Sequence, residues 1–209
     1  MDIEKKYKRE FDILVQKGNL VKDWTNVYQH CKTEGFVAAI MSNLLKLSKE
    51  ESDILIKAAI LHDWYKRNER ERADKKGFEE YVKSEKDSYN ELIKLEVDKR
   101  VVDVAHSVGS LSLNKIIDST DFLKRLMHYI DDICLGDKIV EVDERIDYLE
   151  NQEKYHELNE SGRKVFSGKT YFKVQREVAK QIQTEIESKL NIEPNSLVRL
   201  IKEGYQKIK

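Results

Sequence analysis

Apolar residues recur every three or four positions along most of the chain, which is the spacing of one face of an α-helix. The pattern predicts a first helix over about residues 3 to 17 that ends near Gly18. A second helix is predicted from about Trp24 to Lys46. A third follows Ser48, because Glu51 stands three residues later and completes a capping box. The N-terminal part of the chain is therefore predicted to be a series of helices with short connections.

The pattern beyond residue 86 also predicts helices. Two helical pieces are expected between about Tyr89 and Val108, and another helix is expected to be capped by Ser119 or Thr120 and to stop at Gly136. Pro194 is expected to open a short last helix. Further helices are predicted from the amphipathic patterns over residues 141–164 and 167–190.

Residues from about Asn68 to Lys86 interrupt this series. The segment is rich in charged residues and contains one glycine, Gly77. We interpret it as a loop or a short exposed helix that flanks a cleft.

Proline and glycine are scarce, with 1 proline and 8 glycines in 209 residues. Tight turns between strands usually need glycine or proline, so their scarcity argues against strands and hairpins and favours an all-α fold. No linker divides the chain. We therefore expect residues 1–209 to form one helical domain, a bundle in which the helices of about 140–207 pack on the preceding ones.

The charge balance and the hydropathy of the chain argue against several kinds of partner. The chain has 38 Lys and Arg residues and 39 Asp and Glu residues, so no basic field favours nucleic acid. Its charged start and the absence of a run of about 18 apolar residues predict neither a signal peptide nor a membrane span. We expect a cytoplasmic protein in which Cys31 and Cys134 stay reduced. A homodimer would be unremarkable for a bundle of this size.

Several polar residues with metal-binding atoms occupy predicted apolar faces. His30 starts a helical line that continues into apolar residues, and His62 lies on the apolar line of the next helix. His106 and Asp131 also lie on faces that are otherwise apolar. An unpaired buried polar group costs roughly 1 to 3 kcal/mol, so these groups need partners. One divalent cation would satisfy them together.

The chemistry of such a site favours phosphoester hydrolysis. Imidazole and carboxylate ligands suit Mn, Fe, Co, Ni or Zn, and carboxylates also suit Mg, so the identity of the metal stays open. Three or four protein ligands leave coordination positions free for water. Such a water can lose a proton near neutral pH and attack phosphorus, while the ion neutralises charge on the phosphoryl oxygens.

The order of these residues resembles the HD-domain superfamily of metal-dependent phosphohydrolases. Its signature is a histidine, a later His-Asp pair, here in "AAILHDWYKR", and a distant aspartate, and the resemblance covers about residues 24 to 135. It implies a helical bundle with the site in its core. By this resemblance the metal ligands are His30, His62, Asp63 and Asp131. Lys66 would approach a substrate phosphate as a point charge, and Asp63 would also serve the catalytic step.

Asp131 is preferred to its neighbour Asp132 as the last ligand. Asp131 shares a helical face with the apolar residues Met127 and Cys134, whereas Asp132 lies on a less consistently apolar line. We therefore expect Asp132 to lie behind the ligands or to face solvent.

One metal is favoured over two. A second metal would need more ligands, which Glu34, His128 or Asp132 would have to supply. His106 is instead assigned to the substrate phosphate or to general acid-base catalysis.

The expected substrate is a small phosphorylated molecule, a phosphomonoester or phosphodiester with a nucleotide-like character. Two alternatives stay open: a non-catalytic metal-binding module for sensing or interaction, and a di-iron oxygenase of the same fold, which needs more ligands than this chain provides. The basic residues of the C-terminal part are candidates for lining the pocket, although most are expected to be solvated. They are Arg145, Arg163, Lys169, Lys173 and Arg176.

Overall fold

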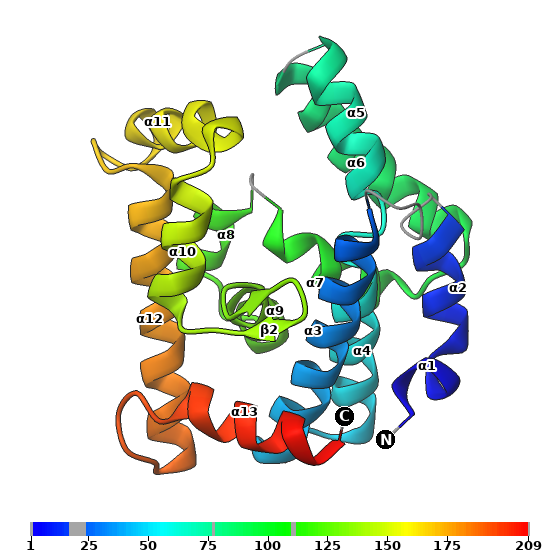
Figure 1. Ribbon diagram of the computed structural model, residues 1–209, viewed down its shortest axis with the longest axis vertical. Coiled ribbons are helices and arrows are strands. Elements are labelled where there is room, and N and C mark those ends of the chain that lie inside the picture. The colour runs from blue at the N-terminus through cyan, green and yellow to red at the C-terminus, as the bar shows by residue number, and fades with distance from the viewer. Residues whose placement is uncertain (1, 17–23, 77, 110–111, 209) are drawn as a thin grey trace.

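The protein is built mainly from α-helices. The computed structural model describes residues 2–16, 24–76, 78–109 and 112–208, except the side chains of residues 72–82. The predicted all-α class is confirmed, with the small addition of a two-stranded antiparallel hairpin. The elements in Figure 1 are α1 (Ile3–Lys6), α2 (Lys8–Gln16), α3 (Thr25–Leu44), α4 (Lys49–Leu61), α5 (Lys66–Lys76), α6 (Phe78–Lys94), α7 (Lys99–Ala105), the 3-10 turn η1 (His106–Val108), α8 (Leu113–Ile117), α9 (Phe122–Asp131), β1 (Cys134–Leu135), β2 (Lys138–Ile139), α10 (Val142–Glu150), the 3-10 turn η2 (Glu153–Tyr155), α11 (His156–Val165), α12 (Tyr171–Leu190) and α13 (Leu197–Ile208).

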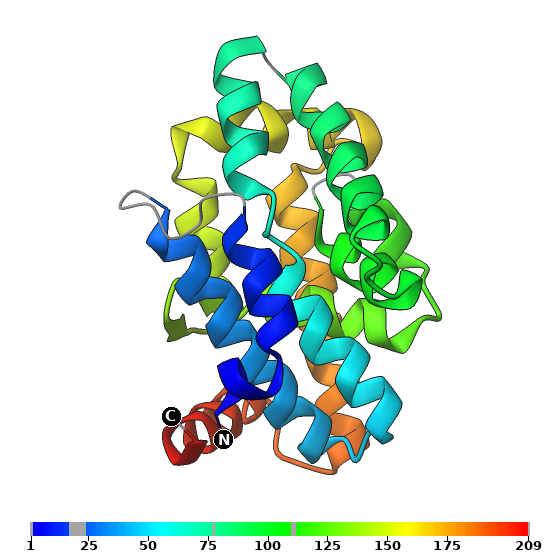
Figure 2. The same cartoon turned by 90° about the vertical axis from the view of Figure 1, so that its right-hand side faces the viewer.

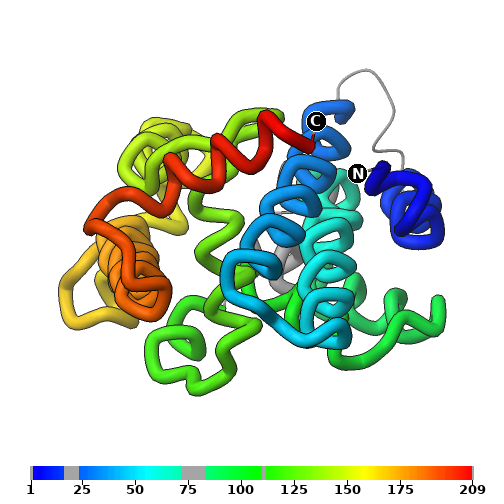
Figure 3. Tube along the Cα trace, turned by 90° about the horizontal axis from the view of Figure 1, so that it is seen from below, coloured from blue at the N-terminus to red at the C-terminus, as the bar shows by residue number. Residues whose placement is uncertain are grey.

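Helices α3 and α4 form the centre of the molecule and lie side by side (Figures 1 and 3). The predicted capping box at the start of α4 is confirmed. Ser48 Oγ accepts a hydrogen bond from the backbone N–H of Glu51 at 3.2 Å, and the Glu51 carboxylate accepts one from the backbone N–H of Ser48 at 2.9 Å. Val37 and Met41 of α3 are fully buried. Polar side chains elsewhere on α3 are therefore held inside the protein.

The other helices surround this pair. Helix α2 packs against α4, and α7 and α9 contact α4 as well. Helix α12 contacts both α9 and α10, and α13 runs from the end of α12 to α3, as the view from below in Figure 3 shows. Figure 2 shows α5 and α6 as a pair of helices that rises beyond one end of α3 and α4. The start of α3, the end of α4 and the start of α5 thus lie at the same end of the molecule.

Residues 68–86 do not form a loop or one short exposed helix, because two helices, α5 and α6, occupy the described part of this segment. The expectation that the segment flanks a cleft is confirmed, since residues of both helices line the cavity described below. The Glu, Lys and Arg residues that suggested a solvated loop are also good helix formers. Arg67 and Glu71 form an i,i+4 ion pair at 2.8 Å within α5. The buried indole of Trp64 donates a hydrogen bond to Ser88 Oγ at 2.9 Å and so fixes α6 beside the end of α4.

The first predicted helix is divided in two. It breaks at Tyr7, whose hydroxyl donates a hydrogen bond to Asp53 of α4 at 2.8 Å. The predicted stop at Gly18 lies outside the described residues.

Three predicted boundaries in the C-terminal half are displaced. The N-cap of α9 is Asp121, whose carboxylate accepts from a backbone N–H, rather than Ser119 or Thr120. This helix ends at Asp131, and Gly136, with a φ of 59°, lies in the hairpin that follows. Helix α13 begins at Leu197, so Pro194 lies in the turn before the helix and does not open it.

Both cysteines, Cys31 and Cys134, are free and buried. Within the described ranges, no helix combines the length and the apolar character that crossing a lipid bilayer requires.

Gly162 is expected to be intolerant of any side chain. A Cβ atom at this position of α11 would lie 2.7 Å from the Cα atom of Tyr171, and backbone cannot move aside as a side chain can. We predict that Gly162→Ala destabilises the fold by at least about 2 kcal/mol, seen as a fall of about 4–8 °C in Tm. Gly204→Ala is the control, because its Cβ would meet only the Ile40 side chain and alanine favours the helix. Equal Tm values for the two variants would contradict this account.

Candidate metal centre

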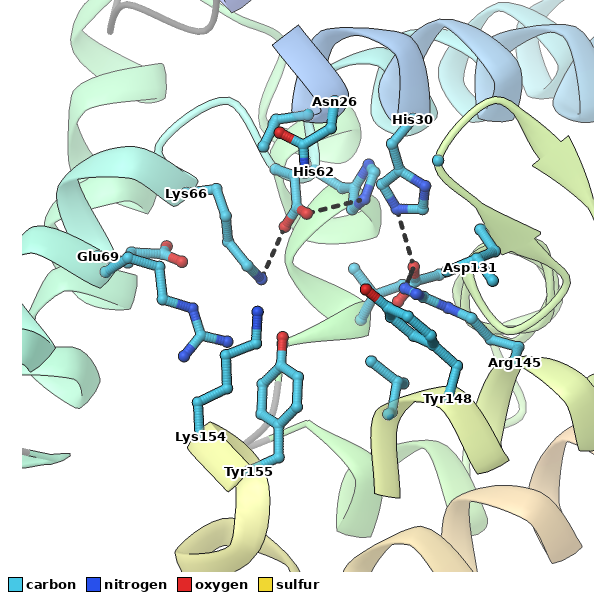
Figure 4. A pocket seen from close by; sticks show the side chains of 18 of the residues that line it. Asn26, His30, His62, Lys66, Glu69, Asp131, Arg145, Tyr148, Lys154 and Tyr155 are labelled. Atoms are coloured by element: carbon cyan, nitrogen blue, oxygen red, sulfur yellow. Dashed lines mark hydrogen bonds and ion pairs between the residues drawn. The ribbon is translucent and has the colours of Figure 1, made fainter. Parts of the chain in front are cut away.

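Side chains with metal-binding atoms meet near the start of α3. His30 and Glu34 lie one turn apart on α3, and His62 follows the last residue of α4. Asp131 ends α9. One ligand atom from each of these residues lies within 4.8 Å of the others. Figure 4 shows His30, His62 and Asp131 directed toward one another. The structure therefore brings together three of the four residues assigned to the metal and adds Glu34. We call these four residues the His-Glu-Asp cluster.

The contacts within the cluster are short. His30 Nε2 lies 2.9 Å from Glu34 Oε1 and 3.2 Å from Asp131 Oδ1. His62 Nδ1 lies 3.3 Å from Glu34 Oε2. The Glu34 carboxylate thus lies between the two imidazole rings. The side chains of the cluster come from α3, from the end of α4 and from the end of α9.

A backbone carbonyl orients His62. Its Nδ1 atom lies 2.9 Å from the carbonyl oxygen of Ala59. Because a carbonyl oxygen can only accept, this contact places a proton on Nδ1 and leaves the lone pair on Nε2 in the neutral ring. Nε2 is buried, has no hydrogen-bond partner in the described part of the chain, and faces Asp63 Oδ2 at 3.8 Å. Two electron-pair donors that face each other in this way are arranged to share a cation.

The electrostatics of the cluster favour a positive charge at its centre. Burial opposes a charge on His30, but Glu34 and Asp131 outweigh burial and raise the pKa of His30 to about 10. Burial also opposes the charge on Asp131, yet the hydrogen bond with His30 and the charge of Arg145 keep the pKa of Asp131 well below its usual range. Burial raises the pKa of Glu34.

The donor set fits a divalent cation. Imidazole and carboxylate together suit Mn, Fe, Co, Ni or Zn, and the carboxylates would also accept Mg. Among the described residues, neither carboxylate oxygen of Glu34 has a well-formed hydrogen bond, and both are buried. A cation would satisfy these oxygens and His62 Nε2 at once. The His-Glu-Asp cluster would hold the ion, with Asp63 beside His62.

Asp63 and Lys66 form an ion pair at the edge of the cluster. Lys66 Nζ lies 3.0 Å from Asp63 Oδ1, and Asp63 Oδ2 lies 3.8 Å from His62 Nε2. Figure 4 shows the Lys66 side chain extending into the cavity. Burial opposes the charge on Asp63, but Lys66 and His62 outweigh it and lower the pKa of Asp63 to about 2. Asp63 is therefore ionised at neutral pH, and its position places Lys66 next to the candidate ion.

Asp132 points away from the cluster and is buried rather than solvent-facing, with 1% of its surface exposed. Its Oδ1 accepts a hydrogen bond from Gln175 Nε2 at 2.5 Å, and its Oδ2 lies 3.4 Å from His128 Nε2. Burial raises the pKa of Asp132 well above its usual value and lowers the pKa of His128 to about 4. The hydrogen bond from Gln175 to Asp132 thus joins the end of α9 to α12.

His106 lies in the wall of the cavity described below, and its ring packs edge-on against Tyr89 with the ring centroids 5.3 Å apart. Burial lowers the pKa of His106 to about 4. The ring is thus neutral near pH 7, which suits a hydrogen bond to substrate better than proton donation.

A cavity of about 760 Å³ opens beside the cluster. Its wall includes basic residues and aromatic residues from α5, α10, η2 and α12, namely Lys66, Arg70, Lys154, Tyr148, Tyr155 and Tyr171. Small-molecule sites commonly have volumes of about 300–1,000 Å³, so the cavity can hold one ligand of moderate size.

The sequence analysis considered two residues of the site only in part: Glu34 as a possible ligand of a second metal, and Arg145 as one of five candidates for lining the pocket. Glu34 had a usable signal, because it stands four residues after His30 on the same helical line. Arg145 had none that separates it from the other basic candidates, yet its side chain is 12% exposed and its Nη2 lies 3.3 Å from Asp131 Oδ1. By contrast, Arg163 pairs with Glu160, and both side chains are more than half exposed.

Comparison with known protein families gives one match. A model of the HD domain family matches residues 27–152, which include every member of the cluster and both members of the Asp63–Lys66 pair. Comparison with curated proteins and with solved structures gave no match.

Proposed function

Because the chain belongs to the HD domain family, which implies the superfamily of metal-dependent phosphohydrolases, we propose that this protein hydrolyses a small phosphomonoester or phosphodiester. The observation that carries the proposal is the position of the cluster. Donors for one divalent ion lie at the wall of a cavity that also presents Lys66 and other cations. A phosphate that contacts the ion would therefore meet compensating charge from the protein.

Some of the side chains in this site would hold the ion, and others would bind the substrate. Bound to the cluster, a divalent ion would act as a Lewis acid, lowering the pKa of water and neutralising phosphoryl charge. Arg145 keeps Asp131 ionised and oriented. Lys66, held by Asp63, supplies a positive charge for a phosphoryl oxygen. His106, neutral at pH 7, is placed to donate or accept a hydrogen bond with the substrate.

A nucleotide-like substrate is supported by the mixture of cations and aromatic rings in the wall. Lys66, Arg70 and Lys154 would attract phosphate, whereas Tyr148, which is 45% exposed, offers a ring surface on which a planar base can stack. Tyr155 is already covered by Arg70, whose guanidinium lies 4.6 Å from the ring centroid.

Removal and return of the metal test this proposal. Chelator-treated protein is expected to lose hydrolysis of bis(p-nitrophenyl) phosphate and p-nitrophenyl phosphate, and to regain it with Mn, Co, Ni or Mg. A panel of nucleoside phosphates would then define the substrate. A reaction that requires iron and dioxygen would favour an oxygenase instead. Bound metal without turnover across the panel would favour a sensing or interaction module.

A further inference from the structure

Glu69 is a buried acid in the cavity wall, and its carboxyl group has no hydrogen-bond partner among the side chains that the structure describes. It lies in the first turn of α5, lines the cavity and is 8% exposed. Within the described residues, no hydrogen bond or ion pair reaches its carboxyl group. Ionisation of a carboxyl group in this position is costly, because burial removes water and no hydrogen bond from the described residues replaces it. An unpaired acid at a ligand-binding surface is typical of a group that acts on the ligand.

The charged groups around Glu69 partly cancel. Lys66 and Arg70 of α5 favour its ionised form, whereas Asp63 and Glu85 of α6 oppose it. Lys154 and Tyr155 also line the same cavity. Burial is the largest influence and, with the two carboxylates, raises the pKa of Glu69 to about 7. A substrate phosphate at Lys66 would add negative charge nearby and favour the protonated acid further.

Glu69 lies close to Lys66, the residue proposed to contact the substrate phosphate. Lys66 and Glu69 are three residues apart on α5, so they share a face of the helix. Figure 4 shows both side chains extending from α5 toward the same cavity. Lys66 contacts Asp63 beside the candidate ion, and Glu69 lies one helical turn farther along. A phosphoester bound at Lys66 would therefore have the Glu69 carboxyl group one helical turn away in the same cavity wall.

We infer that Glu69 is the general acid that protonates the leaving oxygen of the phosphoester. This inference rests on the proposed function. In the step, the oxygen of water forms a bond to phosphorus, and the bond from phosphorus to the ester oxygen breaks with its electron pair on that oxygen. The proton of Glu69 passes to the ester oxygen, which leaves as the alcohol. For a phosphomonoester, dihydrogen phosphate and ionised Glu69 remain, and the carboxylate then recovers a proton from the phosphate, which leaves as hydrogen phosphate.

The dependence on the leaving group tests this role. A general acid contributes about 10²–10⁴-fold when the leaving group is a poor one, whereas nitrophenolate leaves without a proton. We expect Glu69→Gln to lose at least about 10²-fold in kcat with an alkyl phosphate and less than about 10-fold with p-nitrophenyl phosphate. Glu71→Gln is the matched control, because the Glu71 side chain is 45% exposed on the same helix and pairs with Arg67.

The pH dependence gives a second readout. The protonated acid is the active form, so kcat/KM with an alkyl phosphate, which reports the pKa of the free protein, should fall as the pH rises through about 7. This decrease with rising pH should be absent in Glu69→Gln. It should move to lower pH in Glu85→Gln, because that variant lacks a negative charge that opposes the ionisation of Glu69. Carbon-13 NMR of glutamate-labelled, metal-free protein should show a carboxyl resonance that titrates near neutral pH and that is absent from Glu69→Gln.

The outcomes separate the two proposals. Equal losses with alkyl and nitrophenyl substrates, or a Glu69 carboxyl group that titrates at the usual glutamate value, would overturn the role of Glu69 and leave the hydrolase proposal intact. If the metal-loaded wild-type protein hydrolyses no phosphoester, the proposed function fails and this inference fails with it.

Discussion

Replacing Asp131 with asparagine is expected to lower the affinity for a divalent ion by more than about 100-fold, the upper end of the loss seen when only a supporting partner of a ligand is removed. The amide keeps the shape of the side chain but removes the charge that faces His30 at 3.2 Å and Arg145 at 3.3 Å. Phosphoester hydrolysis should fall by at least about 10²-fold. Isothermal titration with Mn and a steady-state assay measure the two effects.

The neighbouring residue provides a matched control for this substitution. Asp132 is more deeply buried than Asp131 but accepts a hydrogen bond from Gln175, and its raised pKa favours the neutral acid. Asparagine is also neutral, so Asp132→Asn should keep its metal affinity and most of its activity. If Asp132→Asn lost metal while Asp131→Asn retained it, the assignment of the last ligand would be reversed.

Replacing His62 with alanine is expected to lower the metal affinity and the rate of phosphoester hydrolysis as much as Asp131→Asn does. The substitution removes the ring that lies 3.3 Å from Glu34 and 3.8 Å from Asp63. The cluster therefore loses one of its two imidazole groups. Groups that act as a unit are not additive. The double variant His62→Ala/Asp131→Asn should therefore be no less active than either single variant. Metal analysis of the purified proteins and kcat/KM for a nitrophenyl phosphate give the comparison.

His156→Ala is the control for loss of a histidine, because His156 is exposed and begins α11 away from the cluster. Its metal content and kcat/KM should match those of the wild type. Fully additive losses in the double variant would instead mean that His62 and Asp131 serve separate sites.

Helical periodicity was sufficient to find most of the fold. The scarcity of glycine and proline predicted the all-α class, and the capping box at Ser48 located the start of α4. The same approach failed over residues 68–86, where the interactions that order α5 and α6 include the long-range bond from Trp64 to Ser88. Periodicity along one segment contains no information about such a partner.

The candidate site was predictable to the extent that its residues lie on helical lines. His30, His62 and Asp131 each continue an apolar face, which is why their convergence could be inferred. Arg145 and Glu69 belong to charge-rich segments, and only packing shows which of the many charged side chains there become buried. Sequence patterns therefore located the ligands better than the groups that would act on the substrate.

The central claim is that His30, Glu34, His62 and Asp131 surround one divalent ion. A crystal grown with Mn and measured at an absorbing wavelength tests this claim directly, since the anomalous signal locates the ion without reference to the protein atoms. We predict a single strong peak within about 2.0–2.3 Å of an imidazole nitrogen of His62 and a carboxylate oxygen of Asp131. A peak elsewhere, or a peak that leaves His62 outside bonding distance, would contradict the account.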